Sequence, residues 1–472
     1  MFDPVIAPSG TLLGLLQRGR GDGTLHALAA PRTEALAALD HCVLHDPRQD
    51  WQVENRSLYY ARLYLDLHGA LDAIEAHLFC AEDHLDTDES RTGLALAVLG
   101  HLASYGREDA LALLRRYAAT GSNWAWALDE LALRDDDSAL RTLAVPVLAR
   151  FPATPEGDAE LAVAVRDAFE PRPWRLWAED RRDAVGGRVR AAQERGCFDR
   201  WQRQMRPSGP RPGWSVQAVF DWAQEGLDRG SVLHVPAARC LNAVAGPEDR
   251  PLILEAARSG SDGARCAALH YLAEVQDPAV LDLIEAAAAA GSRTVAEAAV
   301  AAFERMCGEA AVDRARGWVH RPDALGASAA GVLACRGGAQ DAGLVLGALR
   351  EAVRAEGPDA PSLYPLVDGT GRLGIACAAP VLRHVYRETA ASQLRGRTAR
   401  ALAATDPSFA TGFAVECLWD CEETTREIAA LHAETGDVRV AERLRRLAAD
   451  PAEEDEVQTA VRSRIGPDMP AV

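Results

Sequence analysis

The chain has 472 residues, a formal net charge of −18 at neutral pH and only 6% aromatic residues. All 51 basic residues are arginine, which excludes lysine chemistry such as a Schiff base or a P-loop lysine. A negative charge of this size repels duplex phosphate and disfavours non-specific nucleic-acid binding. Strand signals are scarce and no 18-residue apolar run occurs, so the sequence predicts an all-α protein that does not cross a membrane.

The N-terminal segment, 1–23, lacks a leading basic region and has only a short apolar run, so it does not predict a signal peptide. The ten cysteines are scattered and form no C-x-x-C motif. They are expected to be small buried apolar residues in a reducing cytosol, which predicts a cytoplasmic protein.

Residues 24–152 predict N-terminal helical repeats, with amphipathic helices expected in the stretches that begin at Ala103 and Asp135. His77, Cys80 and His84 would share one helical face, as zinc ligands can. Structural zinc sites usually draw on two separate chain segments, so ordinary histidines are expected here and no metal is predicted.

A calcium loop is excluded at residues 86–97, because Arg91 stands where the sixth position requires glycine and Ala97 where the twelfth requires glutamate. Asp88 or Ser90 is expected instead to cap a helix that starts near Thr92.

Residues 153–235 interrupt the repeats with seven prolines between Pro152 and Pro212 and five of the ten tryptophans. Tryptophan and arginine are the residues most enriched at interface hot spots. Two interpretations stay open: the segment packs against flanking helices, or it docks a partner. Trp174 follows a proline and is expected in a partly exposed loop, whereas Trp201 and Trp222 are expected to be largely buried.

Residues 236–450 contain the clearest pattern, in which seven segments begin alike about thirty-one residues apart. They begin at Glu248, Pro278, Glu309, Gln340, Ile375, Pro407 and Asp437. Each opening has a turn residue followed by apolar positions at i, i+3, i+4 and i+7, and a second, alanine-rich helical run follows. A fixed period in this range indicates a solenoid of paired antiparallel helices. Residues 451–472 form an acidic tail.

Gly369, Gly371 and Gly374 match G-x-G-x-x-G, a pattern typical of dinucleotide binding. No aspartate occurs between Asp368 and Asp406 to bind a ribose, and the glycines fall in an inter-helix turn of the repeat frame. No cofactor is therefore predicted.

The repeats resemble HEAT repeats, in particular the short bacterial, phycobilisome-lyase-like type. The resemblance rests on Gly371–Leu373–Gly374 and Asp277–Pro278, and on an arginine early in the second helix. Arg265, Arg395 and Arg426 are those arginines. The resemblance implies a curved superhelix, in two arrays separated by residues 153–235. It does not identify a function.

The expected function is a non-enzymatic scaffold or adaptor that binds a protein partner along the concave face of the solenoid. No catalytic residue is predicted, and the oligomeric state stays open. The expected partner-binding residues are Trp174, Trp177, Arg181, Arg182, Trp201, Arg203, Arg265, Arg395 and Arg426.

Two alternatives remain. One is a HEAT-like DNA glycosylase, or another nucleic-acid-binding protein, in which Trp174, Trp177, Asp180, Arg181 and Arg182 hold damaged duplex. The other is bilin-lyase-like ligand binding. A continuous basic groove would favour DNA, and a mixed or acidic groove with exposed apolar side chains would favour a protein partner.

Overall fold

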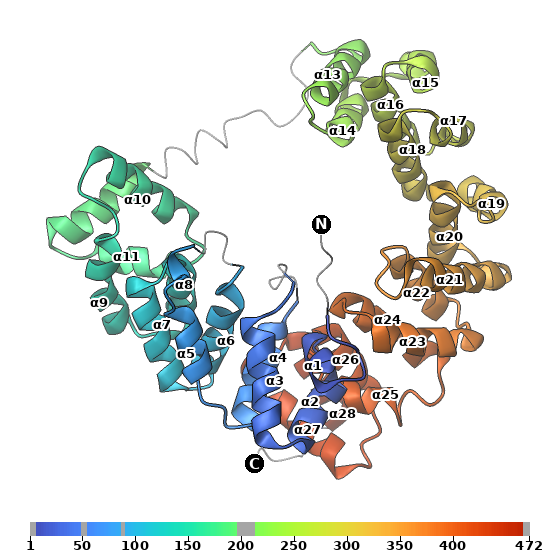
Figure 1. Ribbon diagram of the computed structural model, residues 1–472. Coiled ribbons are helices and arrows are strands. Elements are labelled where there is room, and N and C mark those ends of the chain that lie inside the picture. Colours follow the sequence, from blue (N-terminus) through green and yellow to red (C-terminus); the bar gives the residue numbers. More distant parts are fainter. Residues whose placement is uncertain (1–5, 49–53, 86–89, 196–212, 466–472) are drawn as a thin grey trace. The chain divides into compact units, whose positions relative to one another are not determined.

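The computed structural model describes residues 6–48, 54–85, 90–195 and 213–465 (Figure 1). Within these ranges the regular structure is entirely helical, as the sequence predicts, and helices pack against their neighbours in a manner compatible with an α-solenoid. Among the helices of these ranges, none combines the length and apolar character needed to span a bilayer.

The chain forms two compact units. Unit 1 comprises Met1–Met205, Tyr386–Ala403 and Pro407–Val472, and unit 2 comprises Arg206–Val385 and Ala404–Asp406. The first part of unit 1 contains α1 (Leu12–Gln17), α2 (Gly21–Ala29), α3 (Arg32–Leu44), α4 (Arg56–Asp66), α5 (Asp72–Leu78), η1 (Asp83–Leu85), α6 (Gly93–Ser104), α7 (Glu108–Thr120), α8 (Trp124–Arg134), α9 (Asp137–Leu148), α10 (Pro155–Asp167), α11 (Arg172–Ala178) and the π-helix η2 (Asp183–Gly187). Its second part contains most of α24 (Ser392–Thr405), α25 (Phe413–Cys417), α26 (Glu423–His432), α27 (Val438–Ala449) and α28 (Asp455–Ile465).

Unit 2 contains α13 (Val216–Asp228), α14 (His234–Val244), η3 (Pro247–Asp249), α15 (Arg250–Ser259), α16 (Asp262–Glu274), α17 (Val280–Ala288), α18 (Arg293–Arg305), α19 (Glu309–Trp318), α20 (Ala324–Arg336), η4 (Ala339–Asp341), α21 (Ala342–Glu356), α22 (Leu363–Arg372), η5 (Ala376–Ala378) and most of α23 (Ala379–Glu388).

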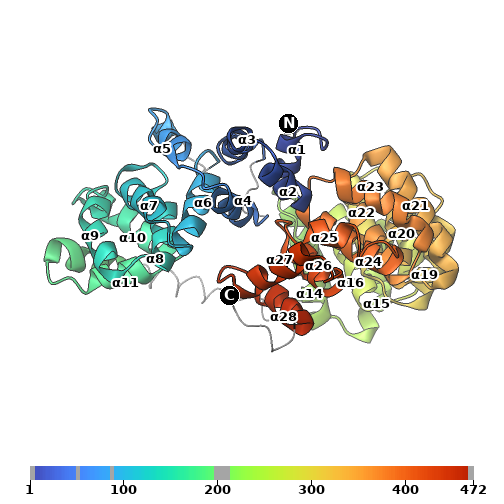
Figure 2. The same cartoon turned by 90° about the horizontal axis from the view of Figure 1, so that it is seen from below.

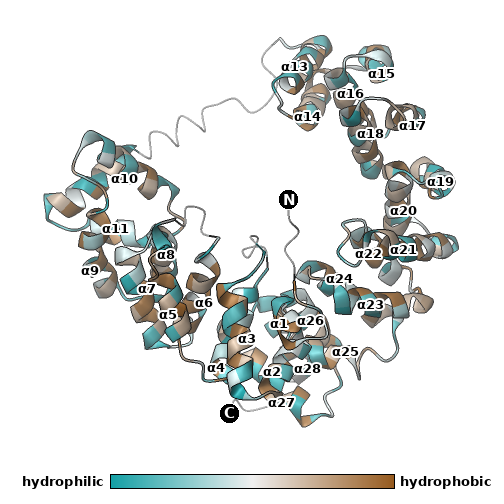
Figure 3. Ribbon diagram, in the orientation of Figure 1, coloured by the Kyte–Doolittle hydropathy of each residue, from teal (hydrophilic) through white to brown (hydrophobic). Residues whose placement is uncertain are grey.

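The helix pairs predicted from the repeat period are confirmed. In unit 2, α16, α18, α20 and α22 each pack against the next, and α15, α17, α19 and α21 each pack on the helix that follows in the chain. The second helices contribute buried alanines to the core: Ala267, Ala298 and Ala401 are at most 3% exposed. Most helices carry both hydrophobic and hydrophilic residues (Figure 3), because only one side of each faces the core.

An arginine–aspartate pair recurs in both units. Each pair joins an arginine of a first helix to the buried aspartate at the turn that begins the next repeat. The pairs are Arg115–Asp135, Arg250–Asp277, Arg316–Asp341 and Arg383–Asp406. The arginine lowers the pKa of the Asp277 and Asp341 carboxyls, chiefly through the hydrogen bonds it donates. The pair at Asp135 shows that the N-terminal helices contain the same arginine–aspartate contact as the repeats of residues 236–450.

The first helices of the chain pack on its last repeats within unit 1. Helix α2 lies against α25 in both views (Figures 1 and 2). The backbone N–H of Cys421 donates to the carbonyl oxygen of Gly19 at 2.8 Å, and Arg62 pairs with Asp450 and Glu453. Segments more than 380 residues apart thus share one core, whose cluster of buried side chains includes Cys421.

Gly21 sets the closeness of this contact. A Cβ atom at residue 21 would lie 1.8 Å from the carbonyl oxygen of Glu416, a backbone atom that cannot swing away. We expect Gly21→Ala to lower the free energy of unfolding of unit 1 by about 1–3 kcal/mol, because α2 and α25 must separate. Urea unfolding monitored by circular dichroism measures the effect.

Gly347 provides the control. It lies inside α21, and nothing lies within 4 Å of a Cβ built there. Gly347→Ala should raise stability by about 0.5–1 kcal/mol through helix propensity alone. If the free energy of unfolding rose in both variants, Gly21 would not lie as close to the carbonyl oxygen of Glu416 as described.

Candidate partner-binding site

Two of the three tryptophans expected to contact a partner, Trp174 and Trp177, are buried. Trp174 and Trp177 are 3% and 1% exposed and lie in α11, so the expectation that Trp174 sits in a partly exposed loop is wrong. Pro173 falls in the first turn of α11, where a missing backbone N–H is tolerated and proline starts a helix. The Nε1 of Trp177 donates to the carbonyl oxygen of Leu140 at 2.8 Å. For these two residues the packing interpretation holds and the docking interpretation fails.

The other tryptophans and arginines of the interruption that the structure describes are more exposed. Arg181 and Arg182 are exposed, and Arg182 pairs with Asp180 at 2.6 Å. Trp222 is half-buried rather than largely buried, and its ring lies 5.3 Å from that of Trp214. Trp201 and Arg203 lie outside the described residues.

Two of the three second-helix arginines are buried and paired within the protein. Arg395 is fully buried and forks onto Asp420, with N–O distances of 2.8 and 2.9 Å. Arg426 is 1% exposed, and Arg265 is half-buried. Arg395 and Arg426 are therefore corrected from partner-binding to structural residues, because a buried guanidinium needs the internal carboxylate that neutralises it.

The residues considered as zinc ligands do not form a metal site. Helix α5 ends at Leu78, so His77, Cys80 and His84 do not share a helical face as expected. His77 bonds to the carbonyl oxygen of Arg91 and His84 to that of Ala81. Across the described ranges, no three His, Cys, Asp or Glu side chains gather as a metal site.

The glycine motif lies at the end of a helix, and only its last glycine falls in the inter-helix turn that the repeat frame predicts. Gly369 and Gly371 fall in the last turn of α22, and Gly374 adopts a φ of 62° just beyond it. The residues before the motif belong to α22 and not to a strand, so the strand that a dinucleotide site requires is not there. Helix α6 was expected to be capped by Asp88 or Ser90, but the residue at its N-cap position is Thr92. Asp88 lies outside the described residues.

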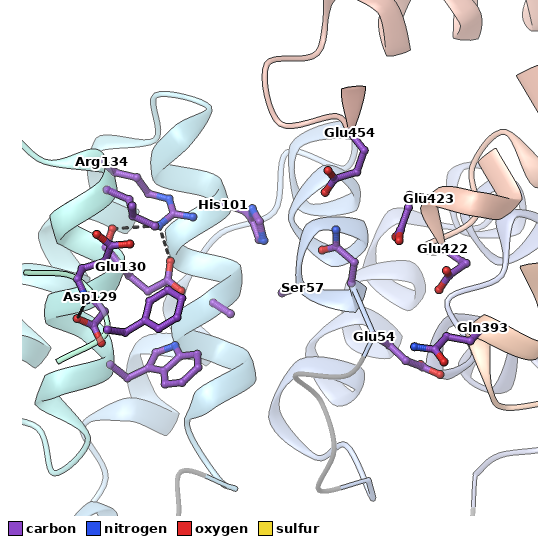
Figure 4. A pocket seen from close by; sticks show the side chains of 16 residues that line it. Glu54, Ser57, His101, Asp129, Glu130, Arg134, Gln393, Glu422, Glu423 and Glu454 are labelled. Atoms are coloured by element: carbon purple, nitrogen blue, oxygen red, sulfur yellow. Dashed lines mark hydrogen bonds and ion pairs between the residues drawn. The ribbon is translucent and has the colours of Figure 1, made fainter. Parts of the chain in front are cut away.

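A cavity of about 700 Å³ lies within unit 1, and we call it the acidic cavity (Figure 4). One wall is formed by α6, α8 and the segment before α11, and the other by α24, the start of α26 and the turn before α28, with the start of α4 between them. Its lining residues are Glu54, Asn55, Ser57, Ala97, His101, Trp126, Asp129, Glu130, Leu133, Arg134, Phe169, Glu170, Gln393, Glu422, Glu423 and Glu454. They include seven carboxylates and one arginine.

Helix α8 supplies the first wall through residues at helical spacing. Trp126, Asp129, Glu130, Leu133 and Arg134 follow one another at intervals of three, one, three and one, which places them on one side of α8. Such a side carries polar and aromatic groups together, so it does not belong to the core. This spacing is visible in the sequence, but nothing local to α8 indicates that this side of the helix lines a cavity.

Glu130 and His101 are the groups of this wall whose pKa values are shifted most. Its carboxylate pairs with Arg134 at 2.6 Å and packs against the backbone of α6 at Gly100, where a Cβ atom would lie 1.8 Å from Oε2. Burial raises the pKa of Glu130 to about 7, and Arg134 only partly opposes this. Burial, with Arg134 and Arg62 nearby, lowers the pKa of His101 to about 4, so the imidazole is neutral at pH 7.

The opposite wall holds carboxylates that the protein does not neutralise. Glu423 and Glu454 accept no hydrogen bond and form no ion pair with any described residue. Burial raises the pKa of Glu454, with Glu423 as the next cause, and burial also raises that of Glu422. Glu422 accepts a hydrogen bond from Ser392 at 2.8 Å, so it is partly held in place.

The raised pKa of Glu130 makes a prediction about stability and pH. The folded protein keeps a proton on Glu130 between its ordinary pKa of 4.5 and about 7, whereas the unfolded chain releases it. The free energy of unfolding therefore falls as pH rises through this window. We expect Glu130→Gln to remove about 1–2 kcal/mol of that fall.

Urea unfolding at several pH values between about 5 and 8 checks this prediction. Burial also raises the pKa of Glu416 to about 7. Glu416 therefore contributes the same decrease in the free energy of unfolding to the parent and to Glu130→Gln. The comparison between them therefore isolates Glu130. Identical pH dependence in parent and variant would show that Glu130 ionises normally.

No known protein-family model matches the sequence, and comparison with curated proteins gives no match. The geometry of the acidic cavity and the repeat pattern therefore carry the functional argument.

Proposed function

We propose that the protein is a non-enzymatic scaffold or adaptor of the HEAT-repeat type, and that it binds a protein partner at the acidic cavity of unit 1. The observation that carries this proposal is the composition of the cavity. Carboxylates share it with apolar side chains that remain in solvent: Phe169 is 82% exposed and Leu133 is 58% exposed. Exposed aromatic and aliphatic groups beside a polar rim are typical of protein interfaces.

The recurring arginine–aspartate pairs and the stacked second helices support the repeat type. We place the protein in the cytoplasm, because the described cysteines are free thiols, including the buried Cys417 and Cys421. In an oxidising compartment disulfides form and persist.

The nucleic-acid alternative receives less support. Seven carboxylates and one arginine give the cavity a charge that repels phosphate. Trp174 and Trp177, which that alternative needs against DNA, are buried in the core. The bilin-lyase-like alternative rests on the repeat type alone.

We expect no binding to undamaged duplex DNA at physiological salt. Non-specific DNA binders reach Kd values of about 10⁻⁴–10⁻⁶ M under such conditions. An anisotropy titration with labelled duplex measures this directly. Micromolar affinity that falls steeply with salt would contradict the protein-partner proposal and favour the nucleic-acid alternative.

Site-specific cross-linking tests the proposal itself. A photoreactive amino acid at Phe169, on the rim of the cavity, is exposed to cytosol of the native cell and the captured proteins are identified. The same amino acid at Val438, which is 76% exposed on α27 outside the cavity, is the control. The proposal requires a protein captured from position 169 and not from 438.

The captured protein, once purified, should bind the parent, and Phe169→Ala should weaken that complex. Hot-spot truncations cost about 2 kcal/mol or more, so the expected loss is about thirtyfold. A captured protein whose purified form binds Phe169→Ala as tightly as the parent would contradict a site at the cavity.

A further inference from the structure

We propose that the acidic cavity receives a cationic segment of the partner, in which an arginine or lysine side chain enters between the walls and apolar neighbours cover the rim. This inference rests on the proposed function and adds the chemistry of the occupant. It draws on the charge of the cavity, on its apolar groups and on its size.

The charge of the cavity is not balanced from within. Glu54 pairs with Arg48 and Arg56, so its charge is already neutralised by the protein. By contrast, Glu423 and Glu454 form no ion pair with a described residue, although both line the cavity. Burial opposes the ionised form of Glu454, as the raised pKa of that carboxyl shows. An entering cation relieves that cost, which is the complementarity that a binding site for a cation requires.

Carboxylates line both walls of the cavity (Figure 4). Glu422, Glu423 and Glu454 point into the cavity from the second wall, and Glu130 and Asp129 belong to the first. His101 lies between the walls and is neutral at pH 7, so it does not compete for the carboxylates. Arg134 is the one fixed cation, and it is held by Glu130 and by the Ser104 hydroxyl at 2.7 Å.

The apolar lining distinguishes a peptide from a free polyamine. Trp126 offers an aromatic face within the cavity, and guanidinium groups stack on such faces. The aliphatic stem of arginine or lysine packs against apolar surface while its charged head stays solvated or paired. Phe169 and Leu133 remain exposed at the rim, where a polyamine would leave them in water and the residues flanking a peptide arginine would cover them.

The size of the cavity limits how much of a partner it can hold. A volume of about 700 Å³ falls within the range of roughly 300–1,000 Å³ typical of ligand pockets. Such a pocket holds one or two side chains and their backbone and is too small for a folded domain. A single extended or helical segment of the partner is therefore the element that docks.

Selection from a random peptide display library tests this inference on the full-length protein. We expect enrichment of peptides that carry arginine or lysine next to aromatic or aliphatic residues. The double variant Glu423→Gln and Glu454→Gln, which removes two charges without changing size, should not enrich them. The matched control is Glu274→Gln with Glu304→Gln, two exposed glutamates of unit 2 whose carboxylates are likewise unpaired, and it should enrich the same peptides as the parent.

Anisotropy titration then measures the best peptide against the variants. We expect about tenfold weaker binding to the cavity variant, unchanged binding to the control, and weaker binding at higher salt. Substitution of glutamine for the basic residues of the peptide should also abolish binding. Spermidine should displace the peptide only at concentrations far above the Kd of the peptide.

Two results would overturn the inference. One is enrichment of acidic or neutral peptides, and the other is a basic peptide that binds the cavity variant as tightly as the parent. Displacement by spermidine at concentrations near the Kd of the peptide would also contradict a peptide-specific site. If cross-linking at position 169 still captured a partner whose binding was insensitive to Glu423 and Glu454, the proposed function would stand and the cationic occupant alone would fail.

Discussion

Replacing Arg426 with methionine is expected to lower the free energy of unfolding of unit 1 by about 3–5 kcal/mol, the usual cost of breaking a buried ion pair. Arg426 is 1% exposed and donates to both carboxylate oxygens of Glu453, at 2.6 and 3.0 Å. It also donates to the backbone carbonyl oxygens of Asp420 and Cys421. Methionine fills similar space but donates to none of these buried acceptors, and Glu453 keeps only Arg62 and the backbone N–H of Glu454 as donors.

Urea unfolding and amide hydrogen exchange in α26 and α28 measure this loss, since exchange reports the opening of individual elements. Arg439→Met is the control, because Arg439 is 81% exposed and pairs with Asp437 at the surface. Its effect should stay within about 0.5 kcal/mol. Equal midpoints for the two variants would contradict a structural role for Arg426.

A second pair of variants separates the ion pair from packing. Glu453→Gln combined with Arg426→Met should cost less than the sum of the single changes, because the two residues share one interaction. Glu453 also pairs with Arg62 at 3.1 Å, so the coupling includes the contact between the first helices and the last repeats. Strict additivity would show that the two side chains act independently.

The helix pairs could be predicted from the sequence because their determinants are local. The period of the apolar positions defines each helix, and a turn residue such as Asp277 marks the start of a repeat. The contact between the first helices and the last repeats could not be predicted in this way. It depends on backbone approaches such as that of Gly21 to Glu416, between segments whose separation in the chain carries no periodic signal.

The functional residues were predicted less well for a related reason. An arginine in a repeat has the same sequence signature whether it faces solvent or a buried carboxylate. Asp420, the partner of Arg395, lies 25 residues further along the chain, and nothing local to Arg395 indicates it. The acidic cavity combines residues from five helices and two turns, so its carboxylates become a site only in three dimensions. The spacing along α8 from Trp126 to Arg134 is the one part that the sequence could have shown.

Replacing Trp174 with alanine is expected to lower the free energy of unfolding by about 3–5 kcal/mol, which is the reverse of what an exposed docking residue would do. The indole is 3% exposed, and its ring lies 4.9 Å from that of Trp177 and 6.3 Å from that of Trp124, edge to face in both cases. Removing it leaves a cavity where α11 packs on α8, together with the loss of two aromatic contacts. Thermal melts and urea unfolding measure the change.

The matched control is Phe169→Ala, five residues earlier in the chain and 82% exposed. This change should alter the free energy of unfolding by less than about 0.5 kcal/mol while weakening partner binding. If Trp174→Ala melted with the parent and instead lost the partner, α11 would be the docking element and the acidic cavity would not.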